Sequence, residues 1–142
     1  MFAKQLTVFI ENRAGRLSEV LDVLKENGVS IISMTLADTT EFGLLRLIVN
    51  NAEQGKENLN ENGFSSLVSD VSVIKIPHEA GSLQKLLKVI DEKGVNIEYM
   101  YGLSIDADQA YVVLKASDMD QLDRILDEIA IKTLSCEDLA NL

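Results

Sequence analysis

Two short stretches of this 142-residue sequence carry residue types that could bind a small anion. Residues 12–17 read N-R-A-G-R-L and residues 78–83 read H-E-A-G-S-L, each where a strand is expected to give way to a helix. The first N–H groups of a helix lack partners within the helix, so they bind carboxylates without a cationic side chain. Gly15 and Gly81 have no Cβ and would let the backbone come close to such a ligand. Side-chain amides and backbone carbonyls could accept hydrogen bonds from an ammonium group.

The two stretches belong to a longer internal repeat. Gly15 and Gly81 are 66 residues apart (81 − 15), and Gly28 and Gly94 are separated by the same distance (94 − 28). Both halves contain Ala-Gly-x-Leu followed by Gly-Val-x-Ile. Self-similarity at one fixed spacing indicates a duplicated fold. The sequence therefore predicts two domains, 1–69 and 70–142.

The elements that must position these stretches follow from the spacing of apolar residues. Alternation predicts strands, and apolar residues at i, i+3, i+4 and i+7 predict helices. In the first half this predicts strands over 5–10, 31–37, 43–49 and 64–69 and helices over 17–26 and 52–62. In the second half it predicts strands over 71–76, 97–103, 111–116 and 132–135, helices over 83–93 and 119–130, and a short tail over 137–142. Turns are expected at 38–41 and 106–108, and Ser117 with Asp120 resembles a capping box at the start of the last helix.

Each half is thus expected to be a β-α-β-β-α-β unit of the ferredoxin-like kind. Right-handed crossovers would place both helices on one face of a four-stranded antiparallel sheet, which gives an α+β fold with two tandem units. Domains of about 70 residues bury only about 60% of their unfolded surface, so the two units are expected to pack together. Joining them edge to edge would remove one exposed sheet edge from each.

The turn and the start of the second strand, G-V-S-I at 28–31 and G-V-N-I at 94–97, resemble the ACT domain, over nearly the whole chain and twice. That family typically has Pro-Gly-x-Leu in the turn, whereas this chain has Ala14 and Ala80 in place of the proline. The chain is most similar to bacterial tandem ACT proteins without an attached enzyme, which carry a stretch similar to N-I-E-Y-M-Y at 96–101. The resemblance implies a regulatory module that binds a small ligand, usually an amino acid. It also implies that the ligand lies between two ACT units, touching the first turn of one and the second strand of the other.

The resemblance makes residues of the two turns and of the two second strands the candidate ligand-binding set. This set consists of Asn12, Arg13, Ala14, Gly15, Arg16, Leu17, Ser30, His78, Glu79, Ala80, Gly81, Ser82, Leu83, Asn96, Tyr99 and Met100. If each site combines one turn with the other strand, Asn12 and Asn96 share one site, whereas His78 and Ser30 share the other. We expect the Asn12/Asn96 site to be the more family-like and the two sites to differ in affinity.

A second interpretation of these residues requires no ligand. Gly15 and Gly81 could be ordinary turn glycines, and Asn96 could cap the start of its strand through a local bond. His78 could be an exposed loop residue, and Arg13 could form a solvated pair with Glu11. The apolar members of the motifs could serve packing alone, and these are Met34, Tyr99, Met100 and Tyr101.

Composition narrows the possible partners. The net charge of −10, with 13 basic and 23 acidic residues, argues against nucleic acid and against an anionic membrane surface. The single cysteine, Cys136, allows no intramolecular disulfide, and no signal pattern or membrane-length apolar run is present, so a cytoplasmic location is expected.

The sequence contains no nucleophile–base signature, phosphate loop or zinc spacing, and Asp106-x-Asp108 lacks the other oxygen ligands of a calcium loop. We therefore expect no enzyme activity, no catalytic residue, no metal and no cofactor. The expected partners are a free amino acid or similar metabolite and a second copy of the chain in a homodimer, with a metabolic enzyme as a further candidate. The alternative function is a structural or interaction subunit that oligomerises or docks on an enzyme without binding a ligand.

Overall fold

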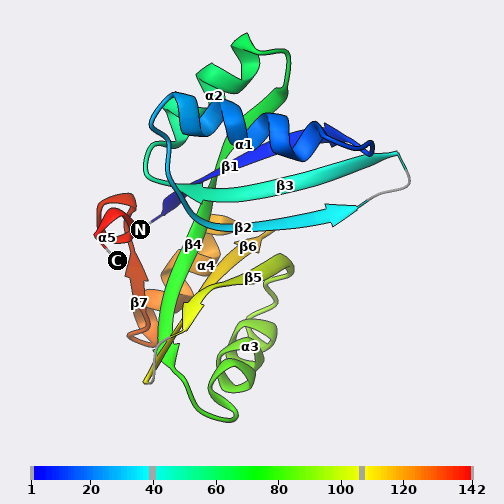
Figure 1. Cartoon of the computed structure of the whole chain (residues 1–142). Coiled ribbons are helices and arrows are strands. Elements are labelled where there is room, and N and C mark those ends of the chain that lie inside the picture. The colour runs from blue at the N-terminus through cyan, green and yellow to red at the C-terminus, as the bar shows by residue number, and fades with distance from the viewer. Residues whose placement is uncertain (1, 39–40, 106–107, 142) are drawn as a thin grey trace. The chain divides into compact units, whose positions relative to one another are not determined.

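The computed structural model describes residues 2–38, 41–105 and 108–141. Contacts divide the chain into two compact units (Figure 1). The N-terminal unit is Lys4–Ser69, and the C-terminal unit is Asp70–Leu142 together with the first three residues. The domain boundaries 1–69 and 70–142 stay a prediction from the sequence. Among the described residues, no helix is long and apolar enough to cross a membrane.

The N-terminal unit forms a sheet with the strand order β2-β3-β1-β4, in which β3 pairs antiparallel with both β1 and β2. Its elements are β1 (Ala3–Glu11), α1 (Arg16–Glu26), β2 (Ile31–Asp38), β3 (Phe42–Val49), α2 (Ala52–Glu61) and the first part of β4 (Ser65–Pro77). The register pairs Leu6 with Leu47 and Val8 with Leu45, so these side chains share one face of the sheet. That face forms the core with Val20 of α1 and other apolar residues of the two helices.

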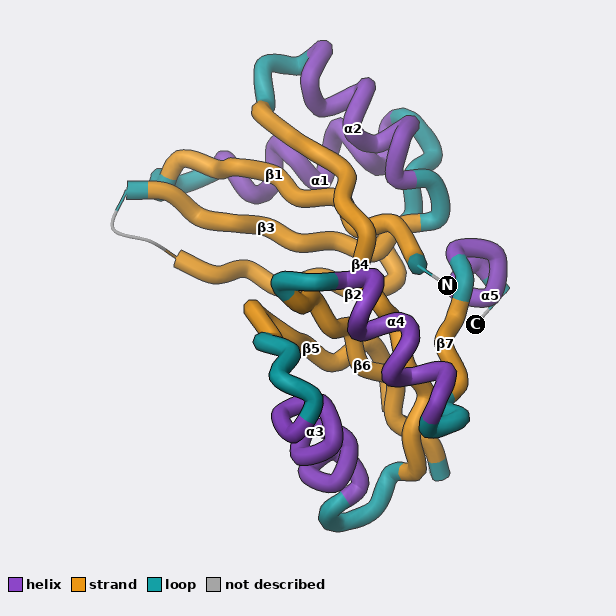
Figure 2. Tube along the Cα trace, turned by 180° about the vertical axis from the view of Figure 1, so that it is seen from behind, coloured by secondary structure: helices purple, strands orange, loops and turns teal. Residues whose placement is uncertain are grey.

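The C-terminal unit repeats this plan with the strand order β7-β4-β6-β5. Its further elements are α3 (Ser82–Glu92), β5 (Ile97–Ile105), β6 (Gln109–Ala116), α4 (Met119–Glu128), β7 (Lys132–Leu134) and α5 (Cys136–Ala140). Ile90 of α3 and Leu122 of α4 lie in one buried cluster with Ile74 and Leu114 of the sheet. Figure 2 shows the separate helices and strands of each unit. The predicted α+β fold with two β-α-β-β-α-β units is confirmed.

Three predictions about the elements were wrong. The strands expected over 64–69 and 71–76 are one strand, β4, because no glycine or proline separates them and Asp70 alone does not interrupt the ladder. The expected tail at 137–142 contains a short helix, α5, which begins with a capping box between Ser135 and Asp138. The N-cap of α4 is Asp118, which accepts a hydrogen bond from the Gln121 N–H, and not Ser117.

Two further predictions have separate outcomes. The turns expected at 38–41 and 106–108 lie partly outside the described residues. Met34, which the ligand-free interpretation assigned to packing, is 43% exposed and lies on the edge strand β2.

The two units differ by one β-bulge. In the N-terminal unit Leu36 pairs with Leu45 and the next residue pairs in step. In the C-terminal unit Gly102 pairs with Val112, but the register then shifts between Gly102 and Ser104, so that Leu103 is an extra residue. Counterparts are therefore 66 residues apart before the bulge (102 − 36) and 67 apart after it (112 − 45).

Candidate functional site

The two predicted turns have the same backbone conformation. Gly15 has φ 87° and ψ −14°, and Gly81 has φ 88° and ψ −8°. The carbonyls of both glycines accept a bond of 3.0 Å, from the N–H of Glu19 in α1 and from that of Lys85 in α3. The positive φ explains the requirement for glycine, since L-residues with a Cβ are strained there.

The starts of α1 and α3 differ from those of the other helices. Asn51, Asp118 and Ser135 cap α2, α4 and α5 by accepting backbone N–H bonds through their side chains. Among the described residues, no side chain caps α1 or α3. A Cβ built on Gly15 or Gly81 would meet no described atom within 4 Å. These two helix starts therefore combine open space with the first-turn N–H groups that suit a carboxylate.

The side chains of the first turn divide into exposed and engaged groups. Asn12, Arg13 and Ala14 are exposed, and Arg13 Nε lies 3.0 Å from Glu11 Oε2, as the ligand-free interpretation expected. The Arg16 side chain is only 17% exposed and its Nη1 lies 2.6 Å from Glu19 Oε2. Arg16 thus packs within its own unit, although it belonged to the predicted ligand-binding set.

A small hollow of about 110 Å³ adjoins the first turn. Its lining includes Asn12, Arg13 and Leu17, together with Leu36 of β2 and Gly43 of β3. A Cβ at Gly43 would lie 3.2 Å from Leu36 Cδ1, so a larger residue there would crowd the hollow. Leu36 and Gly43 were not predicted, because their place beside the turn depends on strand register and no local sequence motif marks it.

The second turn is exposed and adjoins a larger hollow. His78, Glu79, Ala80 and Gly81 are exposed, and the His78 N–H donates to the Asp108 carbonyl over 2.8 Å. Ser82 and Leu83 are half-buried at the start of α3. The hollow has about 300 Å³ and is lined by Glu79, Ser82, Lys85, Val89, Ile129 and Ile131, among other residues. Sequence reasoning missed the contribution of Ile129 and Ile131, which lie more than forty positions beyond the turn in the chain.

The two second strands begin with exchanged side-chain chemistry. The Asn96 amide donates to Ser117 Oγ over 3.1 Å. At the corresponding place in the N-terminal unit, the Ser30 N–H donates to Asn50 Oδ1 over 2.9 Å. Each unit therefore joins the start of its second strand to the end of its third through an asparagine side chain, which accepts from the Ser30 backbone N–H in one unit and donates to the Ser117 hydroxyl in the other. This favours a local structural role for Asn96, although its side chain is exposed.

The remaining second-strand candidates are half-buried. Tyr99 and Tyr101 stack with ring centroids 6.5 Å apart and an interplanar angle of 13°. Met100 packs against the core of the C-terminal unit, which supports its interpretation as a packing residue. Neither Tyr99 nor Met100 is among the described residues that line the hollow beside the second turn.

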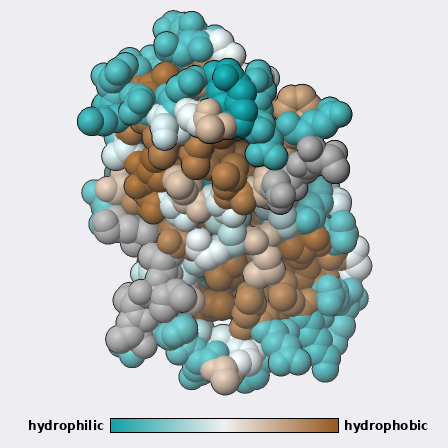
Figure 3. Space-filling model, turned by 45° about the vertical axis from the view of Figure 1, so that its right-hand side comes forward, coloured by the Kyte–Doolittle hydropathy of each residue, from teal (hydrophilic) through white to brown (hydrophobic). Residues whose placement is uncertain are grey.

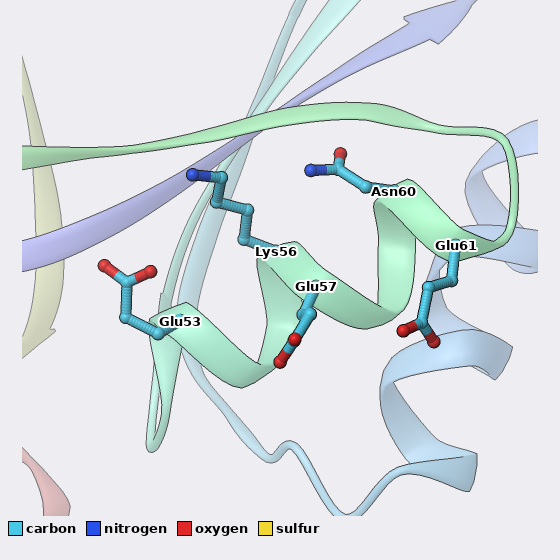
Figure 4. Close-up of a pocket in the computed structure, with 5 residues that line it drawn as sticks. All are labelled: Glu53, Lys56, Glu57, Asn60 and Glu61. Atoms are coloured by element: carbon cyan, nitrogen blue, oxygen red, sulfur yellow. The ribbon is translucent and has the colours of Figure 1, made fainter.

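Another hollow among the described residues lies in the N-terminal unit. A hollow of about 570 Å³ on α2 is lined by Glu53, Lys56, Glu57, Asn60 and Glu61. Figure 4 shows these side chains projecting from the helix in different directions without converging on one point. Among the described residues, no group of His, Cys, Asp and Glu could hold a metal ion.

Comparisons with known proteins agree with this architecture. The family model described as the ACT domain pair matches residues 1–142. The crystal structure of protein BT0572 from Bacteroides thetaiotaomicron is 37% identical, covers 100% of this chain and 98% of that chain, and superposes with a TM-score of 0.94. The regulatory subunits of aspartate kinase from Thermus thermophilus and Thermus flavus share the fold. They have 17% and 14% identity, TM-scores of 0.63 and 0.62, and coverage of 88% and 89% of this chain and 91% and 90% of theirs. A search of curated proteins found no match.

Proposed function

Because this chain belongs to the family of ACT domain pairs, we propose that it is a non-enzymatic regulatory module that binds a free amino acid or similar small metabolite. The observation that carries the proposal is the matched pair of helix starts at Gly15 and Gly81, which share one backbone conformation and lack a side-chain cap among the described residues. Their N–H groups suit the carboxylate of an amino acid, and carbonyls and amides nearby suit its ammonium group. The shared fold with regulatory subunits of aspartate kinase supports a regulatory role.

Within this proposal, Asn12 and Asn96 are the polar residues that distinguish the more family-like site. Asn12 is exposed and lines the hollow beside the first turn, so a ligand at the Gly15 turn could reach it. That each ligand also touches the second strand of the other unit is implied by the family resemblance and forms part of the proposal. A ligand that favours one arrangement of the protein over another would supply the regulatory signal.

A thermal-shift panel of the common amino acids, followed by titration calorimetry, tests the proposal. A ligand that binds only the folded state must raise the melting temperature. We expect Asn12→Ala to weaken binding about tenfold, since one hydrogen bond to a charged group is lost. Asn141→Ala, an exposed asparagine in the C-terminal helix region, is the matched control and should bind normally.

Asn96 needs a control of its own, because its amide bonds to Ser117. Ser117→Ala removes this local bond and keeps Asn96. If Asn96 contacts the ligand, Asn96→Ala should weaken binding more than Ser117→Ala does. Unchanged ligand affinity in both Asn12→Ala and Asn96→Ala would contradict the proposed site.

The exposed apolar side chains of the N-terminal unit favour a second candidate function, assembly with another copy of the chain. Among the described residues, the exposed large hydrophobic side chains all lie within Lys4–Ser69 and are Phe9, Ile31, Met34, Leu36, Phe42 and Leu67. Figure 3 shows patches of hydrophobic residues on one face of the molecule, bordered by hydrophilic residues. Three of them lie on β2, an edge strand with one side open for pairing. A flat thermal-shift panel, together with a dimer that Leu36→Glu dissociates in light scattering, would favour this function over ligand sensing.

A further inference from the structure

The hollow of about 300 Å³ in the C-terminal unit, called here the α3 groove, has a counterpart in the N-terminal unit that is filled. Residues that line the groove on α3 correspond to residues of α1 at the 66-residue spacing, which pairs Ser82 with Arg16 and Lys85 with Glu19. Beyond the bulge the spacing is 67, which pairs Ile131 with Phe64. The duplicated fold therefore allows a direct comparison of two corresponding positions, one filled by a side chain of the protein and one open.

In the N-terminal unit the chain fills this position with its own side chain. The Arg16 guanidinium lies 4.3 Å above the centre of the Phe64 ring and pairs with Glu19 over 2.6 Å. Phe64 is only 5% exposed and belongs to the buried core of its unit. A cation over an aromatic ring with a carboxylate beside it is a favourable arrangement, although the buried Arg16 Nε has no hydrogen-bond partner among the described residues.

In the C-terminal unit each of these three residues has changed. The short Ser82 leaves the space of the arginine side chain open, and the aliphatic Ile131, which is half-buried, replaces the aromatic ring. Lys85 reverses the charge of Glu19. Among the described residues, neither Lys85 nor Glu79 on the rim forms an ion pair.

We propose that the α3 groove binds a short aliphatic carboxylate. The ligand occupies the position that corresponds to the Arg16 side chain of the N-terminal unit, and its carboxylate pairs with the Lys85 ammonium group. The positive charge of Lys85, where the other unit has Glu19, favours an anionic group. The aliphatic side chains of Val89, Ile129 and Ile131 favour a saturated hydrocarbon chain beside it. The volume of about 300 Å³ suits a small ligand. The site depends on Lys85 and the groove walls, so it is independent of the proposed site at Asn12 and Asn96, although Glu79 and Ser82 border both the turn and the groove.

Such a carboxylate could come from an amino acid or from an amine-free acid, and Glu79 distinguishes the two. Its carboxylate on the rim would attract an ammonium group and would gain nothing from an amine-free ligand. L-leucine and 4-methylpentanoate share the aliphatic body and the carboxylate, so they are the two probes. Either ligand in the groove supports the proposal, and Glu79→Gln should weaken L-leucine binding only.

Methyl NMR of the full chain with labelled isoleucine tests the groove directly. We expect the Ile129 and Ile131 signals to shift and saturate with one of the probes, whereas Ile48, buried in the other unit, should not shift. Lys85→Gln should weaken binding about tenfold, as expected when one charged contact is lost. Lys88→Gln, an exposed lysine on the same helix, should leave binding unchanged.

The combined variant Ser82→Arg, Lys85→Glu and Ile131→Phe transfers the filling group of the N-terminal unit into the groove. It should keep the folded NMR spectrum and lose the ligand-induced shifts. Absence of any shift with both probes up to ~10 mM, or binding that Lys85→Gln leaves unchanged, would overturn the proposal. If Asn12→Ala leaves the ligand affinity unchanged while the ligand still shifts the Ile129 signal, only the proposed site at the turns is refuted.

Discussion

At the scale of single residues, the duplicated chain contains the same backbone conformation built from different amino acids. Ala130, just beyond α4, has a left-handed φ of 58°, and its counterpart Gly63 after α2 has a φ of 85°. An L-residue with a Cβ is strained by roughly 1–2 kcal/mol in this region, whereas glycine is not. The C-terminal unit therefore retains a local strain that the N-terminal unit avoids.

Exchanging these two residues tests this strain. Ala130→Gly should raise the free energy of unfolding by about 0.5–1 kcal/mol, because the relief of strain exceeds the entropy that glycine adds to the unfolded chain. Gly63→Ala should lower it by a similar amount, which urea unfolding monitored by circular dichroism can measure. Gly102→Ala has no positive φ and open space around its new Cβ, so it serves as the control. Destabilisation by Ala130→Gly would contradict this account.

The site residues illustrate how far the sequence can predict a site. The turns and their glycines could be predicted because the motif is local and occurs twice. The engagement of Arg16 with Phe64 could not, since the two residues are 48 positions apart (64 − 16) and meet only in the folded unit, where α1 contacts α2 and Phe64 follows the end of α2. The hydrogen bond between Asn96 and Ser117 could not be predicted either, because these residues are 21 positions apart in the sequence.

At the scale of elements, the helix caps show where local rules compete. Two overlapping patterns could start α4, one from Ser117 to Asp120 and one from Asp118 to Gln121. Asp118 has the extended conformation of an N-cap, with φ −121° and ψ 96°, and accepts the Gln121 N–H over 3.0 Å. Apolar periodicity fits both starts, so it could not decide between them.

The two candidate caps of α4 make different contributions that substitution can separate. Asp118→Ala should lower the free energy of unfolding by about 1 kcal/mol, the usual cost of a lost N-cap. Ser117→Ala should cost less, because it removes only an exposed hydrogen bond with Asn96. Thermal or urea unfolding of the two variants measures the difference, and equal losses would restore Ser117 as the cap.

Helix α5 was missed although its starting signal is present. Ser135 and Asp138 stand at the spacing of a capping box and bond reciprocally, with Asp138 Oδ2 accepting the Ser135 N–H over 2.9 Å. That backbone hydrogen bond, followed by the one with the Ser135 side chain, lowers the pKa of Asp138. The helix has one buried residue, Leu139, which is too few for an apolar period to be recognised.

At the scale of the whole molecule, β4 belongs to the sheets of both units. Its 13 residues run from Ser65 to Pro77 and cross the division at Ser69 without a break. The pairs with β6 and β7 involve only residues 72–77, so each sheet uses its own part of β4, and the two parts share one unbroken strand backbone. Cooperative unfolding of the two units is therefore expected.

Inserting Gly-Ser-Gly between Ser69 and Asp70 tests this coupling. The natural chain should unfold in one calorimetric transition, and the insertion should divide it into two, because the flexible residues interrupt the shared strand. The same three residues added after Asn141 provide a control of equal composition. Two transitions in the natural chain would contradict the expected coupling.

The bulge at Leu103 also bears on the ancestry of the chain. A one-residue change in a paired strand would normally turn its apolar side chains to the wrong face. Here the extra residue is confined to the bulge, and Val112 still contributes to the core as Leu45 does in the other half. A single one-residue insertion or deletion is therefore enough to account for the change of spacing between the two halves. A comparison of the two halves at one fixed spacing is accordingly in register before Leu103 and out of register by one residue after it.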